Sequence, residues 1–545
     1  MNDLSPLARP PERVTTPGHL LGLWRAWRSS APPLLLLVLA TVAAVVTLAP
    51  IYYLLDRAGA LGWANVRHEL FQRSTFELLV RSVRLAVVVT LACVVIGVAA
   101  AWLVVRTDVP GRRTWQVVLA LPLAVPSYAA AYAWLSWRPS MPPFAGSVLT
   151  LTLVSYPYVF LPVAAALRRL DPAHEEVARS LGHGRVSVLT RLTLRQLRPA
   201  ITAGALIVML YVLSDFGAVA MMRYEVFTFV IYGAFNAGFN PSRAAILSIA
   251  LVAVALVVVV AEARLRGSPS YARLGGGTPR RQMLVPLGRT KPLVLTLLGL
   301  LCAAGVGFPA WRFVYWTGQA LQTSIPWDEL VPALGNTLWY SLLAAVATLV
   351  LAVPTGVLAA RYRNRATMVL ERSTYVGHAL PGIVIGISLV FVGVRLLRPI
   401  YQELPLLVLA YVVLFLPLAV GAVRVAVEQS PAGLEDVARS LGHRPRSVLT
   451  RVTLPLAAPA VASGAALVFV TTMKELPATL LLHPTGSDTL ATRLWTYTAE
   501  ANYAAGAPYA AALVLFAAVP TALLSILVLE RREREPAPTS EPTHA

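Results

Sequence analysis

Two acidic residues inside long apolar segments are the side chains of this sequence best suited to chemistry. Asp215 and Glu475 lie 260 positions apart, each at the same depth of a strongly apolar stretch. An ionisable side chain within a membrane is costly and usually faces a polar interior. Carboxylate oxygens are hard ligands, so a pair of acids around a shared axis could attract a hard cation.

Neighbouring polar side chains extend this candidate site. Helical spacing puts Tyr211 on the face of Asp215 and Thr471 on the face of Glu475. The candidate pathway residues are Tyr211, Ser214, Asp215, Thr471, Lys474 and Glu475. Either acid could instead neutralise a nearby arginine or Lys474, or satisfy a helix end, and both interpretations stay open.

Signals for catalysis, cofactors and resident metals are missing from the sequence. It contains no GxxxxGK[ST] phosphate loop, and the glycines at 275–277 lack the lysine and the preceding strand. The eight histidines show no ligand spacing, and the two cysteines, Cys93 and Cys302, indicate neither a disulfide framework nor a zinc site. We therefore expect a protein that is not an enzyme and uses no cofactor.

A polar, basic segment occurs twice, 260 positions apart. EEVARSLGHGRVSVLTRLTLRQLRPA begins at Glu175 and EDVARSLGHRPRSVLTRVTLPLAAPA begins at Glu435, with 17 of 26 positions identical. In the first copy Asp171 and Pro172 predict a helix start, and Gly182 predicts a left-handed helix end. A second short helix ending near Pro199 would complete a bracket that presents apolar and acidic side chains to a partner. The alternative is a loop that only orders its neighbours.

The elements that must position these residues are membrane helices. The chain is 57% hydrophobic and 13% charged, with a mean hydropathy of +0.66, and its apolar runs reach the length that crosses a bilayer. We predict an all-α polytopic membrane protein with twelve spans in two parallel six-helix halves. The spans are Pro33–Leu54, Leu85–Val105, Trp115–Trp137, Ala145–Leu167, Pro199–Met221, Ala244–Val260, Pro292–Phe313, Leu338–Ala360, Tyr375–Val394, Pro405–Val427, Pro459–Leu482 and Tyr509–Leu529.

Basic residues in the short loops predict the orientation. The segment 264–291 holds seven Lys and Arg, whereas 316–335 holds none, so both termini and both repeat copies are predicted to be cytoplasmic. The stretch 56–84, placed outside, carries five arginines and fits less well. The net charge of +20 is explained by cytoplasmic loops, so we expect no nucleic-acid partner.

This reading divides the chain into five parts. They are a cytoplasmic N-terminal segment (1–32), a first module (33–266), a cytoplasmic linker (267–291), a second module (292–530) and a cytoplasmic tail (531–545).

The repeat resembles the cytoplasmic loop of binding-protein-dependent ABC importer permeases. That loop has glutamate, two small residues and, four positions later, glycine, followed further on by an aliphatic residue, leucine and proline. The first copy corresponds to this pattern at Glu176, Ala178, Gly182, Leu192 and Leu194, and the second at Asp436, Ala438, Gly442, Val452, Leu454 and Pro455. The resemblance implies that the ATPase-coupling residues are Glu175, Glu176, Ala178 and Gly182 in the first loop and Glu435, Asp436, Ala438 and Gly442 in the second. The copies depart from the pattern at Val177, Val437, Asp436 and Arg195.

This resemblance implies partners and a location. The two loops would dock into a cytoplasmic ABC ATPase, present in two copies, and a periplasmic substrate-binding protein would deliver the cargo. The chain would be a multi-pass protein of the bacterial inner membrane, surrounded by the lipid bilayer.

A finer resemblance concerns the cargo. MKELPATLLL from Met473 and SDFGAV from Ser214 look like the two halves of fused ferric iron permeases. Thiamine and small anions such as phosphonate are alternatives, because their permeases share this architecture. A twelve-span secondary transporter is the rival from another class, and it gives no reason for duplicated cytosolic brackets.

Overall fold

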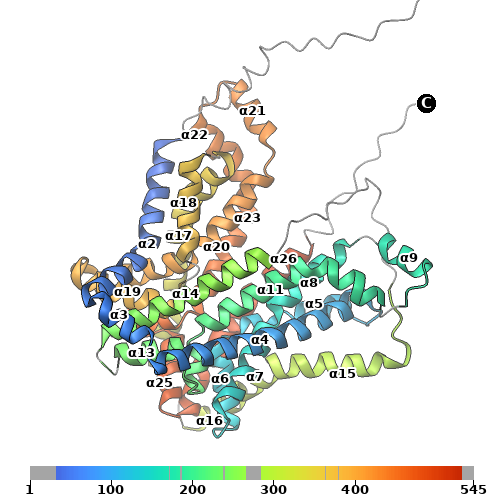
Figure 1. Cartoon of the computed structure of the whole chain (residues 1–545), viewed down its shortest axis with the longest axis horizontal. Coiled ribbons are helices and arrows are strands. Elements are labelled where there is room, and N and C mark those ends of the chain that lie inside the picture. The colour runs from blue at the N-terminus through green and yellow to red at the C-terminus, as the bar shows by residue number, and fades with distance from the viewer. Residues whose placement is uncertain are drawn as a thin grey trace, which may run out of the picture.

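The computed structural model describes residues 32–170, 172–184, 187–236, 238, 240–265, 284–323, 325–362, 364–377 and 380–530. Nearly all of the predicted N-terminal segment 1–32, most of the linker 267–291, the tail 531–545 and the predicted cap Asp171 lie outside these residues. Figure 1 shows the helical arrangement of the chain.

Ten helices of the described chain are long and apolar enough to cross a membrane. Each coincides with a predicted span, because uninterrupted apolar runs must satisfy their backbone hydrogen bonds internally. The first half supplies α2 (Leu34–Leu61), α4 (Arg73–Arg106), α7 with α8 (Pro143–Ser155, Pro157–Arg169), α11 (Leu194–Ser214) and α14 (Pro241–Leu265). The second half supplies α15 with α16 (Lys291–Cys302, Phe308–Thr323), α17 (Trp327–Arg361), α20 (Leu404–Gln429), α23 (Leu454–Met473) and α26 (Tyr503–Glu530).

The predicted count of twelve spans is not confirmed, because the third predicted span of each half is broken. In the first half the chain bends by 87° between Arg112–Ala124 and α6 (Ser127–Trp137), so this pair at most makes an eleventh span. In the second half α18 (Arg365–Val376) is followed by the short α19 (Gly382–Arg395). Pro126 and Pro381 are the N-cap residues of α6 and α19. Proline removes a backbone donor and clashes with the preceding turn, so a helix restarts there.

The fifth predicted span of each half is also interrupted, at the candidate acid. In the first half α11 ends at Ser214, and Asp215 separates it from α12 (Gly217–Met221) and α13 (Phe227–Asn236). In the second half α23 ends at Met473, and Glu475 separates it from α24 (Pro477–Leu482) and α25 (Leu490–Ala499). The predicted continuous spans Pro199–Met221 and Pro459–Leu482 are therefore wrong in their second parts.

The first helix of each half packs across the other half. α2 lies against α17, α18 and α19, and Figure 1 shows it beside α17 and α18. α16 packs on α6 of the first half and on α26. The two halves therefore pack on each other through their first helices.

The described end of the linker is anchored to the first half. Val285 pairs with Thr107 in an isolated parallel bridge, and Asp108 accepts hydrogen bonds from the Leu287 N–H (2.9 Å) and Lys291 Nζ (2.8 Å). The bond from Lys291, followed by that from Leu287, lowers the pKa of Asp108 below its ordinary value, so this carboxylate is charged at neutral pH.

Candidate functional site

Each repeat copy begins with a short helix that ends at a glycine. These helices are α9 (Pro172–Ser180) and α21 (Ala432–Ser440), which we call the repeat helices; Figure 1 shows them at the periphery. Gly182 has a φ of +83°, so the left-handed end predicted for the first copy is confirmed, and Gly442 has the same conformation (+84°) in the second.

Two backbone hydrogen bonds close each repeat helix. The Gly182 N–H donates to Arg179 O (3.0 Å) and the His183 N–H to Ala178 O (3.1 Å). The second copy repeats both bonds, from Gly442 to Arg439 (3.0 Å) and from His443 to Ala438 (3.1 Å). This is the Schellman arrangement, which requires a residue that tolerates positive φ. It explains why glycine follows four positions after the alanine in both copies.

The second part of the bracket differs from its prediction. It does not end near Pro199 but passes through a π-helical stretch, Val188–Thr193, directly into α11, with Pro199 inside that helix. The second copy does the same through Leu449–Thr453 into α23. The repeat therefore connects rigidly to the fifth membrane helix of its half.

The first acid of each copy is held by an arginine that sequence comparison missed. Arg106 Nη2 lies 3.0 Å from Glu175 Oε1, and Thr193 Oγ1 donates to the same oxygen (3.2 Å). In the second half Arg361 Nη2 lies 2.7 Å from Glu435 Oε1, and Thr453 Oγ1 donates to that oxygen (3.0 Å). The arginines are 255 positions apart rather than 260, so the single offset that aligned the repeats did not align them.

The second acid of each copy points away from this contact. Glu176 and Asp436 are exposed, whereas Glu175 is partly buried and Glu435 is buried, so each repeat helix separates a shielded acid from a solvent-facing one. Apolar side chains share the exposed surface: Val177 and Val437 are 58% and 56% exposed, and Leu181 and Leu441 are both 74% exposed. Beside α21 a groove of about 470 Å³ is lined by Leu434, Val437, Leu441, Val448 and Leu456, among others. Paired apolar patches of this kind mark protein contact sites.

The candidate acids within the apolar core occupy the helix breaks. Asp215 accepts hydrogen bonds from Ser127 Oγ (2.5 Å) and the Ala218 N–H (3.0 Å). Glu475 accepts from the N–H groups of Ala478 and Thr479 (both 2.9 Å) and from Thr479 Oγ1 (2.7 Å). Each carboxylate therefore satisfies the first amides of the short helix that follows it.

The halves meet around these breaks. Lys474 Nζ donates to Leu123 O (2.7 Å), which belongs to the break in the third helix of the other half. Tyr128 packs closely on Gly217, where an added Cβ would lie 2.8 Å from Tyr128 Cβ, and it interacts electrostatically with Glu475. Tyr128 thus links the surroundings of the two acids.

The other candidate pathway residues have fewer contacts with the two acids. Tyr211 interacts electrostatically with Asp215 and packs on Tyr158 at 5.6 Å, whereas the Thr471 hydroxyl bonds to Leu467 O of its own helix (2.8 Å). Ser214 is the last residue of α11. Within the described residues no group of three or more His, Cys, Asp or Glu side chains could hold a metal ion.

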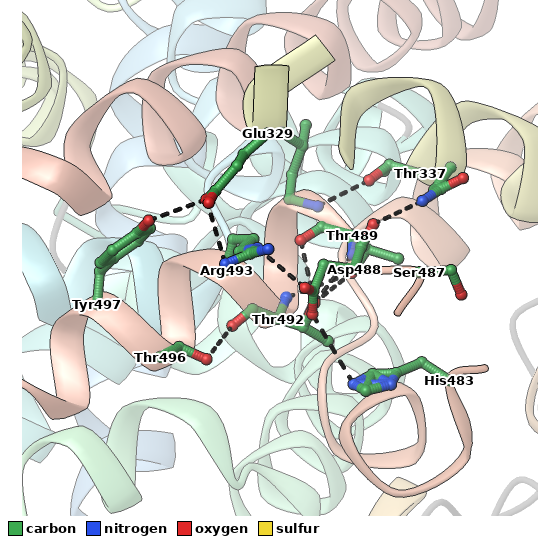
Figure 2. Close-up of polar contacts among 12 residues, drawn as sticks. Glu329, Thr337, His483, Ser487, Asp488, Thr489, Thr492, Arg493, Thr496 and Tyr497 are labelled. Atoms are coloured by element: carbon green, nitrogen blue, oxygen red, sulfur yellow. Dashed lines mark hydrogen bonds and ion pairs between the residues drawn. The ribbon is translucent and has the colours of Figure 1, made fainter. Parts of the chain in front are cut away.

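A further polar cluster lies at the start of α25, and sequence reasoning did not find it. Figure 2 shows Arg493 between Glu329 and Asp488, at 3.2 Å and 2.9 Å respectively. Tyr497 donates to Glu329 Oε2 (3.1 Å). The Leu490 N–H donates to Thr337 Oγ1 (2.9 Å), and in the first half the Phe227 N–H donates to Ser82 Oγ (3.1 Å). The first amides of α25 and α13 are therefore held in the same way.

Comparison with known proteins agrees with this architecture. The family model described as the inner membrane component of binding-protein-dependent transport systems matches residues 93–265 and 352–532. The chain is 34% identical to the Fe(3+)-transport system permease protein FbpB 2 of Haemophilus influenzae over 496 residues, 90% of this chain and 98% of that one.

Two further relatives are more distant or shorter. The probable ABC transporter permease protein y4fN of Sinorhizobium fredii is 25% identical over 81% of this chain and 86% of its own length. The putative 2-aminoethylphosphonate transport system permease protein PhnV of Salmonella typhimurium is 30% identical over 40% of this chain and 82% of its own length.

The two matched segments each contain one repeat helix and one broken fifth helix, and together with the first relative they cover most of the chain. The predicted absence of catalysis agrees with a permease component, which is not itself an enzyme. The chain therefore belongs to the inner-membrane components of binding-protein-dependent ABC importers, as a multi-pass permease built from two modules.

Proposed function

We propose that this permease moves ferric iron, delivered by a periplasmic binding protein, into the cytoplasm. The observation that carries the transport mechanism is the matched pair of repeat helices, each with an arginine-paired, shielded acid on one face and exposed valine and leucine on the other. Two copies of a cytoplasmic ATPase would dock on these apolar surfaces. Burial of the four exposed aliphatic side chains would supply the contact, at about 25 cal/mol for each Å² removed from water.

In this proposal the coupling residues act in two groups. Glu175, Ala178 and Gly182 shape and anchor the first repeat helix, and Glu435, Ala438 and Gly442 do so for the second. Glu176 and Asp436 face the ATPase. The departures from the family pattern, Val177 and Val437, lie on the docking surface.

The repeat helices, both termini and the linker are then cytoplasmic. The five arginines of the stretch 56–84 oppose this orientation by number alone, but most are engaged locally. Arg81 pairs with Glu225 at 2.6 Å, Arg84 donates to Tyr224 Oη at 3.0 Å, and the Arg57 guanidinium lies 5.0 Å from the Phe391 ring centre. The dense basic segment 264–291 supports the orientation.

The translocation pathway would run between the two sets of broken helices. Asp215 and Glu475 hold the breaks open as caps of α12 and α24, with Tyr211, Ser214, Thr471 and Lys474 nearby along the same helices. Interrupted helices are tolerated at membrane depth only where protein or a water-filled cavity surrounds them. Such a region is where a polar cargo can pass.

Iron is favoured by the relative that matches nearly the whole chain, whose name assigns it Fe(3+) transport. Lys474 favours the second candidate, a small oxyanion such as a phosphonate, because a cation placed between the halves would attract an anionic cargo. The 2-aminoethylphosphonate relative matches only 40% of this chain. Thiamine and proton-coupled secondary transport have no such supporting observation.

Uptake into vesicles that contain the reconstituted permease identifies the cargo. The permease, its ATPase and its binding protein are placed in proteoliposomes, and accumulation of ferric iron, 2-aminoethylphosphonate and thiamine is measured. We expect ATP-dependent accumulation of iron only, with the other two at the level of empty vesicles. Phosphonate accumulation without iron would replace the iron proposal by the oxyanion alternative.

A further inference from the structure

The second membrane helix of each half is much longer than a bilayer requires. α4 has 34 residues and α17 has 35. At 1.5 Å per residue each extends about 50 Å, compared with about 30 Å for the hydrocarbon core. Each helix is therefore long enough to contact structural elements on both sides of the membrane.

The cytoplasmic end of each long helix is its arginine. Arg106 is the last residue of α4 and Arg361 the last residue of α17, and their ion pairs to Glu175 and Glu435 are largely shielded from water. Arg361 also donates from Nη2 to Ser430 O (3.0 Å), two residues before α21 begins. A shielded ion pair is not readily exchanged for water, because an unpaired buried charge is strongly unfavourable.

The other end of each long helix holds the short helix that follows the broken fifth span. Ser82 of α4 accepts from the first amide of α13, and Thr337 of α17 accepts from the first amide of α25. Figure 2 shows Thr337 beside the α25 cluster. The two attachment points are 24 residues apart in both helices (106 − 82 and 361 − 337), or about 36 Å.

We propose that α4 and α17 act as transmission rods between the ATPase and the outer mouth of the permease. In this mechanism, which rests on the proposed function, Arg106 and Arg361 are positioning residues. They fix the repeat helices to the rods. A displacement driven by the ATPases is therefore passed along each rod to α13 or α25, which is attached about 36 Å from the arginine. The attachment points have the same spacing along both rods.

The two rods differ at their cytoplasmic ends, because the linker is attached to α4. The Val285 N–H donates to Arg106 O (2.8 Å), so the end of the first rod is also tied to the segment that leads into α15. Tyr362, which follows Arg361, instead bonds back to Leu358 O (2.9 Å) within its own helix. Loss of Arg106 therefore leaves this backbone tie in place, and the combined variant is needed for a complete test.

The test measures two quantities in the same complex: the transport per ATP hydrolysed, and the distance between α13 and α25. Spin labels are placed at Asn236→Cys and Ala499→Cys, exposed last residues of α13 and α25, while the native Cys93 and Cys302 are buried. In the wild-type complex, trapping the ATPases with ATP and vanadate should change the distance between the labels. With Arg106→Gln and Arg361→Gln we expect the ATPase to stay bound, the distance to stop responding, and transport per ATP to fall about tenfold.

Two further variants show whether the arginines position the repeat helices or only stabilise the fold. Arg106→Lys with Arg361→Lys keeps the charge and should restore most of the response, whereas Arg365→Gln, an exposed arginine four residues beyond Arg361, should behave as wild type. An unchanged distance response and unchanged coupling in the glutamine variant would overturn the proposal. So would a proportional loss of ATPase binding and transport that lysine does not rescue. If the wild-type chain binds no ATPase, the proposed function fails first, independently of the arginines.

Discussion

Substitution of Gly182→Val together with Gly442→Val is expected to abolish stable association with the ATPase while the permease still reaches the membrane. Both glycines have φ near +83°, a conformation that costs other residues about 1–2 kcal/mol and costs a β-branched residue more. The helix ends would rearrange and lose the bonds from His183 to Ala178 and from His443 to Ala438. Because about 1.4 kcal/mol corresponds to tenfold in affinity, two strained contacts should weaken binding by about a hundredfold or more.

Co-purification of the ATPase with the tagged permease measures this effect. Gly184→Val is the matched control, since Gly184 lies two residues further on, has open space around its Cβ position and lacks a positive φ. The control should retain the ATPase. Retention by the double variant as well would show that the repeat helices are not the docking elements.

Substitution of Asp215→Asn together with Glu475→Gln is expected to lower transport by about tenfold to a hundredfold without loss of the ATPase. Hydrogen bonds to a charged group contribute about 1.5–3 kcal/mol, against about 1 kcal/mol for neutral ones. The amides keep the size of the acids but replace carboxylates that accept from Ala218, Ala478 and Thr479. The breaks in the fifth helices would loosen, and the charge beside the pathway would be lost.

Uptake per permease molecule, normalised to membrane abundance, is the measurement. Thr202→Val is the control, because the Thr202 hydroxyl is bonded to Arg198 O within α11 (2.9 Å) and Thr202 is not one of the candidate pathway residues, and it should transport normally. Wild-type uptake by the double amide variant, at normal abundance, would remove both acids from the pathway.

The long apolar helices and the repeat helices could be predicted from the sequence because their signals are local. Hydrophobic runs of membrane length need no partner to be recognised. The glycine after the polar segment indicates a helix end by itself, and Gly182 and Gly442 adopt the expected conformation.

The helix breaks could not be predicted from hydropathy, because a broken and a continuous helix have the same composition. Pro126 and Pro381 stand at the starts of α6 and α19, but a proline alone does not fix the 87° change of direction, which depends on the packing of α6 against its neighbours. The role of the two acids as helix caps could have been predicted from their positions in the sequence. Asp215 stands three residues before the amide it caps, and Glu475 precedes Pro477 at the start of α24.

The arginines at the ends of the long helices needed three-dimensional information. Arg106 and Glu175 are distant in the sequence, as are Arg361 and Glu435, and the two halves differ by five residues between these positions. A search at one fixed offset therefore finds the acids and not their partners.

Dependence of uptake on ATP in a defined membrane shows whether this chain works as the permease of an ATP-driven importer. Vesicles containing this chain alone are compared with vesicles that also contain the ATPase, with loaded binding protein outside and with ATP or an imposed proton gradient. We expect no uptake by the chain alone, and uptake only when the ATPase and ATP are both present. Proton-driven accumulation by the lone chain would contradict it.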